Sequence, residues 1–349
     1  MSQKSIKKIK NNFNKKYKNT QLWKIILVAF LIIGITVGCV FCIFISNQKY
    51  TESYNTYFSD KIYFDMGVLN NLYRNIYSNN TIATFTDCNI REIGNCFTFK
   101  KNKYIAVTNY INEKETFINI INITNKQNFN ISFNKIIDRP LEDPYIIIKD
   151  DIIYLFCEDK LDIPFKNMCI YKSYDLKNFI RIDKIIGPSN NLYESNDVSS
   201  PKIIKKGNLY WMLYEGRSEL TNGCICLAYS KDLINWIKYK KNPIITGSRN
   251  NKKIKNNSTN VFHFFDHIVP DDIKYDNDKY IATFHVYCYN VDEWRLIVLY
   301  SYDLFVWYQF RKFMEIQDCD YGQGIMFIDD NFYYSNSENN KLKLITRNS

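Results

Sequence analysis

Histidine is scarce in this chain of 349 residues, which contains only three. None of the eight cysteines that follow residue 45 has a partner at C-x-x-C spacing. Because zinc sites are built from closely spaced Cys and His, this pattern argues against a metal site. Neither a metal nor another cofactor is expected.

Acidic residues are missing from the first 24 positions, which hold eight lysines. The formal net charge of the whole chain is +10, so the remainder carries only about +2. A strongly basic chain suggests nucleic-acid binding, but here the excess charge belongs to one terminal tail. We therefore expect no nucleic-acid partner for the folded part.

Charge is also missing from Ile25–Ile45, and a helix of that length covers roughly 31 Å, enough to cross a bilayer. The run is too long for a typical signal-peptide core, and no small-residue cleavage site follows it. Lysines concentrate before it, which places the amino terminus in the cytoplasm. The pattern predicts a single-pass type II signal-anchor that inserts into the lipid bilayer. The large carboxy-terminal part would then lie outside the cytoplasm, in a lumenal or extracellular space.

The most informative stretch is Val198–Ile245. Runs of β-branched and aromatic residues at Lys202–Ile204 and Leu209–Tyr214 are separated by Lys-Gly-Asn, which is typical of two strands and a tight turn. Two more strands are expected at Ile225–Tyr229 and Trp236–Tyr239. Four short antiparallel strands in about fifty residues make one blade of a β-propeller.

Parts of this blade recur along the chain at intervals of about 50 to 70 residues. The sequence Ser-x-Asp-Leu followed by an aromatic residue begins at Ser173, Ser230 and Ser301, and we expect its Asp to be structural. Copies of the second strand bring the number of units to five. The last unit is short of strands, so Thr81–Phe85 is expected to close the ring.

These observations predict an all-β fold, a five-bladed β-propeller preceded by one transmembrane helix. The expected divisions are a Lys-rich tail at 1–24, the span at 25–45, a stem at 46–80 and the propeller at 81–349. Cysteines outside the span are either disulfide-bonded or buried thiols. The candidate pairs for disulfides are Cys88 with Cys96 and Cys157 with Cys169.

Aligning the blades on their second strands brings polar residues to one edge, because the start of one strand and the end of its antiparallel neighbour lie together. Asp143 stands at the start of a first strand, and the residues that follow second strands include Glu158, Glu215 and His285. Further candidates beside them are Asp197 and His267. We predict that these residues gather at one end of the central channel.

The sequences LEDPYIIIKDDIIYLFCED, SSPKIIKKGNLYWMLYEG and AYSKDLINW resemble the five-bladed propeller glycosidases. That superfamily includes the arabinanase and xylosidase group, the invertase and levansucrase group, and the mannoside phosphorylases. Such proteins open a blade with Asp-Pro and carry the Ser-x-Asp-Leu turn later in the blade. The resemblance covers about residues 90 to 340 and implies a carbohydrate partner.

The resemblance implies glycosidic bond cleavage or transfer by paired carboxylates. Asp143 matches the Asp-Pro position and is expected to be the base, with Glu215 as the acid. Glu158, Asp197, His267 and His285 are expected to bind substrate. Where the arabinanase-like pattern has an acid, however, this chain has Asn95 in blade one and Ser200 in blade three. The alternative is therefore a glycan-binding or adhesion propeller that has lost catalysis.

Overall fold

The computed structural model describes eleven stretches of the chain, all within one compact unit, Asn71–Ser349. These stretches are 81–84, 90–112, 115–124, 140–159, 167–247, 252–263, 265–288, 292–309, 324–328, 331–336 and 341–345. The predicted tail, membrane span and stem lie outside them. Across the described stretches, the search for a helix with the length and apolar character of a membrane span finds none.

The described part of the chain is nearly all β. Its strands form five sheets, and its single helix there is the short α2 (Lys252–Asn257). In chain order the first two sheets contain β2 (Ile90–Phe99), β3 (Asn102–Asn112) and β4 (Glu115–Asn122), then β5 (Leu141–Lys149), β6 (Ile152–Asp159), β7 (Asn167–Ser173) and β8 (Ile180–Ile186). The third contains β9 (Asp197–Lys206), β10 (Leu209–Ser218), β11 (Thr221–Ser230), β12 (Trp236–Lys238), β13 (Ile245–Gly247) and β14 (Asn260–Phe262). The fourth contains β15 (His267–Asp276), β16 (Lys279–Cys288), β17 (Glu293–Ser301) and β18 (Trp307–Gln309), and the fifth contains β1 (Thr81–Thr84), β19 (Ile325–Ile328), β20 (Asn331–Asn336) and β21 (Lys341–Ile345).

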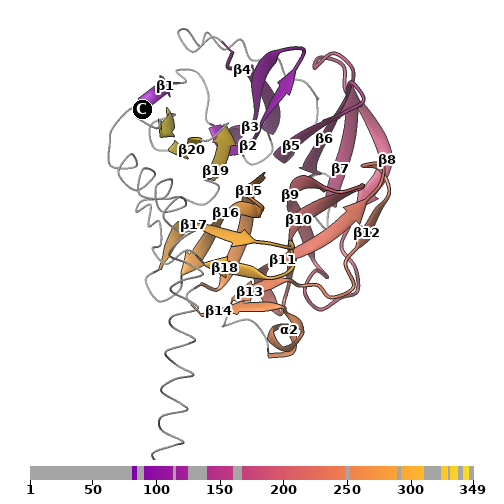
Figure 1. The fold of residues 1–349 in the computed structure, drawn as a ribbon, viewed down its shortest axis with the longest axis vertical. Coiled ribbons are helices and arrows are strands. Elements are labelled where there is room, and N and C mark those ends of the chain that lie inside the picture. The colour runs from indigo at the N-terminus through magenta and orange to yellow at the C-terminus, as the bar shows by residue number, and fades with distance from the viewer. Residues whose placement is uncertain are drawn as a thin grey trace, which may run out of the picture. The chain divides into compact units, whose positions relative to one another are not determined.

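The sheets are arranged as the blades of a propeller. Their first strands face a common centre (Figure 1), and β2 contacts β5, β5 contacts β9, β9 contacts β15, β15 contacts β19, and β19 contacts β2. Strand β1 from the beginning of the domain pairs antiparallel with β21 from its end. The expected closing strand is therefore confirmed.

Four of the five sheets have four or more strands, and the sheet of β2, β3 and β4 has three among the described residues. The third blade has the four strands expected for it, each longer or shorter by a few residues. It also carries β13 and β14, which the sequence reading did not foresee. Strand β14 runs parallel to β13 and ends the sheet on its outer side.

Tight turns join the first two strands of four blades. The two residues between the strands are Lys100-Lys101, Asp150-Asp151, Gly207-Asn208 and Asn277-Asp278. Positive φ angles occur at both positions in three of these turns, and at Gly207 in the fourth. Because Asn, Asp and Gly tolerate that conformation, such pairs mark hairpin turns that fit the twist of the strands.

The Ser-x-Asp-Leu sequences form three copies of one turn, here called the outer turns (Ser173–Leu176, Ser230–Leu233 and Ser301–Leu304). In the second copy, Asp232 Oδ1 accepts hydrogen bonds from the backbone N–H groups of Ile234 and Asn235, at 2.9 and 2.7 Å. Leu233 has a positive φ of 70°, and its carbonyl accepts a hydrogen bond from Trp236 Nε1. The structural role expected for this Asp is confirmed.

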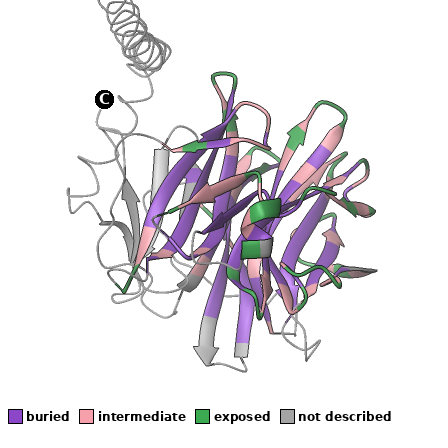
Figure 2. Cartoon of the chain, turned by 90° about the horizontal axis from the view of Figure 1, so that it is seen from below, coloured by how far each residue is buried: buried purple, intermediate pink, exposed green. Residues whose placement is uncertain are grey.

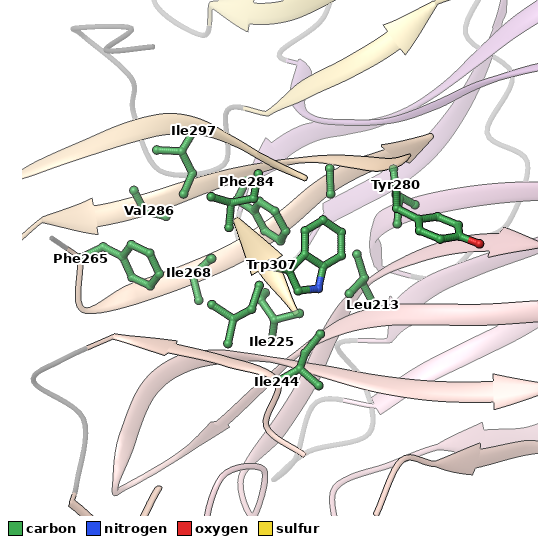
Figure 3. Packing of buried hydrophobic residues seen from close by; sticks show 14 of the residues in the cluster. Leu213, Ile225, Ile244, Phe265, Ile268, Tyr280, Phe284, Val286, Ile297 and Trp307 are labelled. Carbon is green, nitrogen blue, oxygen red and sulfur yellow. The ribbon is translucent and has the colours of Figure 1, made fainter. Parts of the chain in front are cut away.

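Apolar side chains fill the spaces between neighbouring blades. Buried residues follow the middles of the strands, whereas exposed ones concentrate at loops and α2 (Figure 2). Between the third and fourth blades, Trp307 packs among Leu213, Ile225 and Phe284 (Figure 3). Cys157 and Cys169 are buried free thiols with Sγ atoms 3.3 Å apart. Cys88 lies outside the described residues.

Candidate functional site

The first strands of four blades are irregular at the same level. Register shifts occur between Ile93 and Cys96 in β2, around Asp143 in β5, around Ser200 in β9, and between Pro270 and Asp272 in β15. Asp143 and Ser200 have nearly equal positive φ angles of 52° and 53°. β-Bulges and unusual backbone angles are common next to active sites, where they redirect side chains. We call this level, together with the ends of the adjacent second strands, the inner ends of the blades.

Asp143 is joined to the next blade at the inner ends. Its Oδ2 accepts a hydrogen bond of 2.6 Å from the Ser200 hydroxyl. Its backbone N–H donates to Glu92 Oε2 at 3.1 Å, so that the first three blades meet here. Asp143 is partly exposed, unlike most of its neighbours. A polar, accessible carboxylate on a bulge is suited to contact a ligand.

The first blade lacks a carboxylate at the bulge itself. A side chain at Gly94 would place its Cβ 2.1 Å from the carbonyl oxygen of Pro144, so only glycine fits there. The Asn95 side chain accepts from Ile146 N–H and donates to Ile146 C=O, both at 2.7 Å. Asn95 is therefore structural, and Glu92 is the acid that this blade contributes.

Glu215 is buried and has a partner at each carboxylate oxygen. Oε2 accepts a hydrogen bond of 2.7 Å from Ser199, and Oε1 lies 2.6 Å from His267 Nε2. A Cβ at Gly223 would lie 2.1 Å from the His267 ring, which explains the glycine beside this pair. Glu215 thus fixes the position of His267, which belongs to the next blade.

Charge compensation keeps Glu215 ionised. Burial by itself raises its pKa, but the charge of Arg217 and the contact with His267 outweigh burial and lower the pKa to about 2. Arg217 Nε lies 3.5 Å from Glu215 Oε1 and 3.7 Å from Asp197 Oδ2. Arg217 thereby links Asp197 to the same cluster. A carboxyl with so low a pKa holds no proton at neutral pH, which disfavours the acid role predicted for Glu215.

His285 forms the second histidine–carboxylate pair. Its Nδ1 lies 2.5 Å from Asp271 Oδ1. Burial lowers the pKa of His285, but the charge and hydrogen bond of Asp271, with the charges of Glu215 and Asp143, raise it overall above 6.5. The ring of Trp294 packs against both histidines, with centroid distances of 5.1 Å to His267 and 5.3 Å to His285.

Glu158 lies at the predicted end of β6 but takes part in none of these contacts. It is buried directly opposite Glu142 of β5. The neighbouring Asp159 forms an ion pair of 3.2 Å with Arg181. The structure therefore joins Asp143, Glu215, His267 and His285, with Asp197 through Arg217, and leaves Glu158 aside.

A second group of buried polar residues lies further along the first strands, next to the inner ends. Asp272 Oδ1 lies 3.5 Å from the Tyr145 hydroxyl, and its Oδ2 accepts a hydrogen bond of 2.8 Å from Phe327 N–H. Burial raises the pKa of Asp272 to about 7, although its backbone hydrogen bonds and the charge of Lys202 oppose the rise. This carboxyl titrates near neutral pH.

Several residues of the cluster were missed in the sequence. Glu92, Ser199 and Asp271 occur on first strands without a motif that distinguishes them. Arg217 had a usable signal, because it lies two residues after Glu215 and alternate residues of a strand share a face. Among the described residues, no group of three or more His, Cys, Asp and Glu side chains is placed to hold a metal ion.

Comparison with solved structures identifies the class of fold. One similar structure is a glycoside hydrolase with a TM-score of 0.54 and 12% identity, covering 76% of this chain and 90% of that one. Another is a GH43_1 enzyme from Xanthomonas citri in complex with xylotriose, with a TM-score of 0.51 and 8% identity, covering 78% and 91%. No family model and no curated protein sequence matches the chain. The chain shares the β-propeller fold of these glycoside hydrolase structures.

Proposed function

We propose that this chain is a glycoside hydrolase-like protein that binds a glycan at the inner ends and cleaves or transfers a glycosidic bond. The observation that carries the proposal is the set of hydrogen bonds that join Asp143 to Ser200 and Glu215 to His267 across successive blades. His285, which contacts Asp271, lies within the electrostatic influence of both carboxylates. The likeness to glycoside hydrolase folds supports the same conclusion. An accessible Asp143 beside buried, charged neighbours has the chemistry of a general base.

In this proposal Asp143 removes a proton from the water or hydroxyl that attacks the anomeric carbon. Ser200 holds one of its oxygens, and the negative charge of Glu215 attracts the positive charge that develops on the sugar ring. His267, Asp197 and Arg217 position the ligand. Glu158 is buried opposite Glu142 and is the weakest of the proposed substrate residues.

The test is turnover by the full-length chain, solubilised in detergent, on a panel of pentosides and hexosides. We expect at least one substrate to be hydrolysed, and Asp143→Asn to abolish most of that activity. Asp150→Asn, which changes an exposed carboxylate in a hairpin turn, serves as the matched control. Turnover that is unchanged in Asp143→Asn would contradict the proposal.

A second candidate function is glycan binding without catalysis. It is favoured by Asn95 and Ser200, which stand where the arabinanase-like pattern has an acid, and by the structural hydrogen bonds of Asn95. A glycan array probed with the full-length chain distinguishes the two functions. Binding of a glycan that is recovered intact after long incubation favours the binding module.

We also propose that the ring contains five complete blades. The closed order of contacts from β2 through β19 and the pairing of β1 with β21 support this number. Engineered cysteines at Ala83 and Leu342, which face each other in that pairing, should form a cross-link. Cysteines at Ala83 and Lys205 serve as the control pair and should not form a cross-link.

The proposed location is a membrane, with the propeller outside the cytoplasm. The support is the uncharged run of Ile25–Ile45 next to the Lys-rich tail, because charged groups in a bilayer cost several kcal/mol and such a run has few other stable placements. Protease added to sealed vesicles with the cytoplasmic face outward should trim the tail and leave residues 47–349 intact. Digestion of the propeller without detergent would show that the orientation is the opposite of the one proposed.

A further inference from the structure

We propose that His285 is the proton donor of this site, with Asp271 holding its Nδ1 so that Nε2 carries the transferable proton. The inference rests on the proposed function and assigns its missing acid. It replaces the expectation that a second carboxyl, Glu215, performs this step.

The first argument is that the carboxylates at the inner ends are already engaged as acceptors. Oε2 of Glu215 accepts a hydrogen bond from Ser199, and its Oε1 contacts His267 Nε2. Asp143 accepts from Ser200 and fits the role of base. An acid must hold a proton in the resting state and release it in the transition state, which neither of these environments favours.

The second argument is the position of His285 among negative charges from three elements. Asp271 on β15 contacts it directly, and Glu215 on β10 and Asp143 on β5 both favour its charged form. A protonated imidazole balances buried carboxylates that otherwise repel one another.

The third argument is orientation. The contact of 2.5 Å between Nδ1 and Asp271 selects one ring nitrogen as the anchored one. A carboxylate on one nitrogen of a histidine fixes the ring and leaves the other nitrogen to react. The ring of Trp294, 5.3 Å away, restricts the remaining motion of the imidazole.

The chemical step balances without an oxidant or reductant. The Nε2 proton of His285 passes to the glycosidic oxygen as the bond between that oxygen and the anomeric carbon breaks. A water oxygen bonds to the anomeric carbon, and its proton passes to Asp143. The imidazole and the carboxylic acid then exchange protons with solvent, so that one water is consumed per bond cleaved.

The decisive experiment varies the leaving group. An alkyl glycoside needs a proton on its departing oxygen, whereas a 2,4-dinitrophenyl glycoside of the same sugar leaves as a stable anion. For the full-length chain, His285→Asn should lower kcat/KM for the alkyl glycoside by about 10²- to 10⁴-fold. For the dinitrophenyl glycoside the loss should be less than about tenfold. The exposed His263→Asn is the matched control and should change neither rate.

Equal losses on both substrates would show that His285 only positions the ligand, and unchanged rates would show that it has no part in the reaction. If Glu215→Gln, and not His285→Asn, lost activity on the alkyl glycoside but kept it on the dinitrophenyl glycoside, Glu215 would be the acid. Absence of turnover by the unmodified chain on every glycoside rejects the proposed function itself, together with any donor role.

A second measurement does not depend on turnover. The chain has three histidines, so nitrogen-15 labelling of histidine gives a spectrum that single substitutions can assign. His285 should titrate above the ordinary value of 6.5, and Asp271→Asn should lower its pKa. The rate on alkyl glycosides should fall as pH rises through the same pKa. A His285 that is neutral below pH 6 would overturn the inference.

Discussion

The outer turns and the inner ends of the blades differ in how closely they repeat. Each outer turn has a Ser, an Asp and a Leu with the same hydrogen bonds and a positive φ at the Leu. At the inner ends the corresponding positions hold different residues, with Asp143 in one blade and Ser200 in the next, although their backbone angles agree. The repeated backbone is thus kept at both places, but the side chains repeat only at the outer turns.

The difference has a physical cause. Each outer turn satisfies its own backbone groups, so the three blades that contain one need the same residues there. The inner ends face side chains of other blades, and a network such as that of Asp143 with Ser200 requires unlike partners. Side chains that repeat from blade to blade therefore serve the fold. Side chains that differ between blades at the same backbone position indicate the candidate site. Substitutions on each side of this comparison should separate activity from stability.

The largest effect is expected at the inner end of β5. Asp143→Asn removes the proposed base and should reduce kcat/KM by about 10³-fold, within the range for general acid–base catalysis. The free energy of unfolding should change little, because Asn still accepts a hydrogen bond from Ser200. Steady-state rates and urea unfolding of the same samples test both statements. A large loss of stability with normal activity would erase the distinction between the two regions.

Asp272 should make stability depend on pH. Its pKa is about 7 in the folded chain, whereas the ordinary value is 3.8. Between these two pH values the folded state therefore holds a proton that the unfolded state releases. Stability should therefore fall as pH rises from about 4 to 7, by at most about 4 kcal/mol. Urea unfolding at pH 5 and pH 8.5 measures the difference. In Asp272→Asn this part of the pH dependence should vanish, and parallel curves for the two proteins would exclude the effect.

Glu215→Gln should destabilise the fold by about 3 kcal/mol, because it removes the buried carboxylate that faces the charge of Arg217 and weakens the contact with His267. The folded pKa of about 2 lies below the ordinary 4.5. The stabilisation by the carboxylate is thus complete above pH 4.5 and is lost as pH falls through 2. The unfolding free energies of the two proteins should converge at low pH. A constant difference across that range would contradict the charge-based explanation.

The smallest effect is expected at an outer turn. Asp232→Ala removes hydrogen bonds to the backbone N–H groups of Ile234 and Asn235 and should cost about 1 kcal/mol of stability. Activity should not change. Thermal unfolding and rate measurements check the two parts separately, with Lys231→Ala as the control in the same turn. Reduced activity in a stable Asp232→Ala protein would show that an outer turn also serves the site.

Much of the fold could be predicted because its signals are local. The residues of the hairpin turns, the apolar and aromatic run of Leu209–Tyr214 and the recurrence of Ser-x-Asp-Leu each depend on neighbours within a few positions. Even the closing strand could be expected, since the last blade lacked one, and β1 pairs with β21 as anticipated. The additional strands β13 and β14 escaped prediction because they are three residues each, too short to show a period.

By itself, the sequence determined the blades, their order and the edge on which the polar residues gather, because strand alternation and antiparallel pairing are set within each blade. It also brought Asp143, Glu215 and His285 to that edge. Only the tertiary structure decided which residues meet there: Glu92 with Asp143, Ser199 and His267 with Glu215, and Asp271 with His285. Two of these four pairs, Glu92 with Asp143 and His267 with Glu215, join different blades. The pKa shifts of Glu215 and His285 follow from their partners. Contacts of that kind depend on how neighbouring sheets pack, which no local pattern in the sequence specifies.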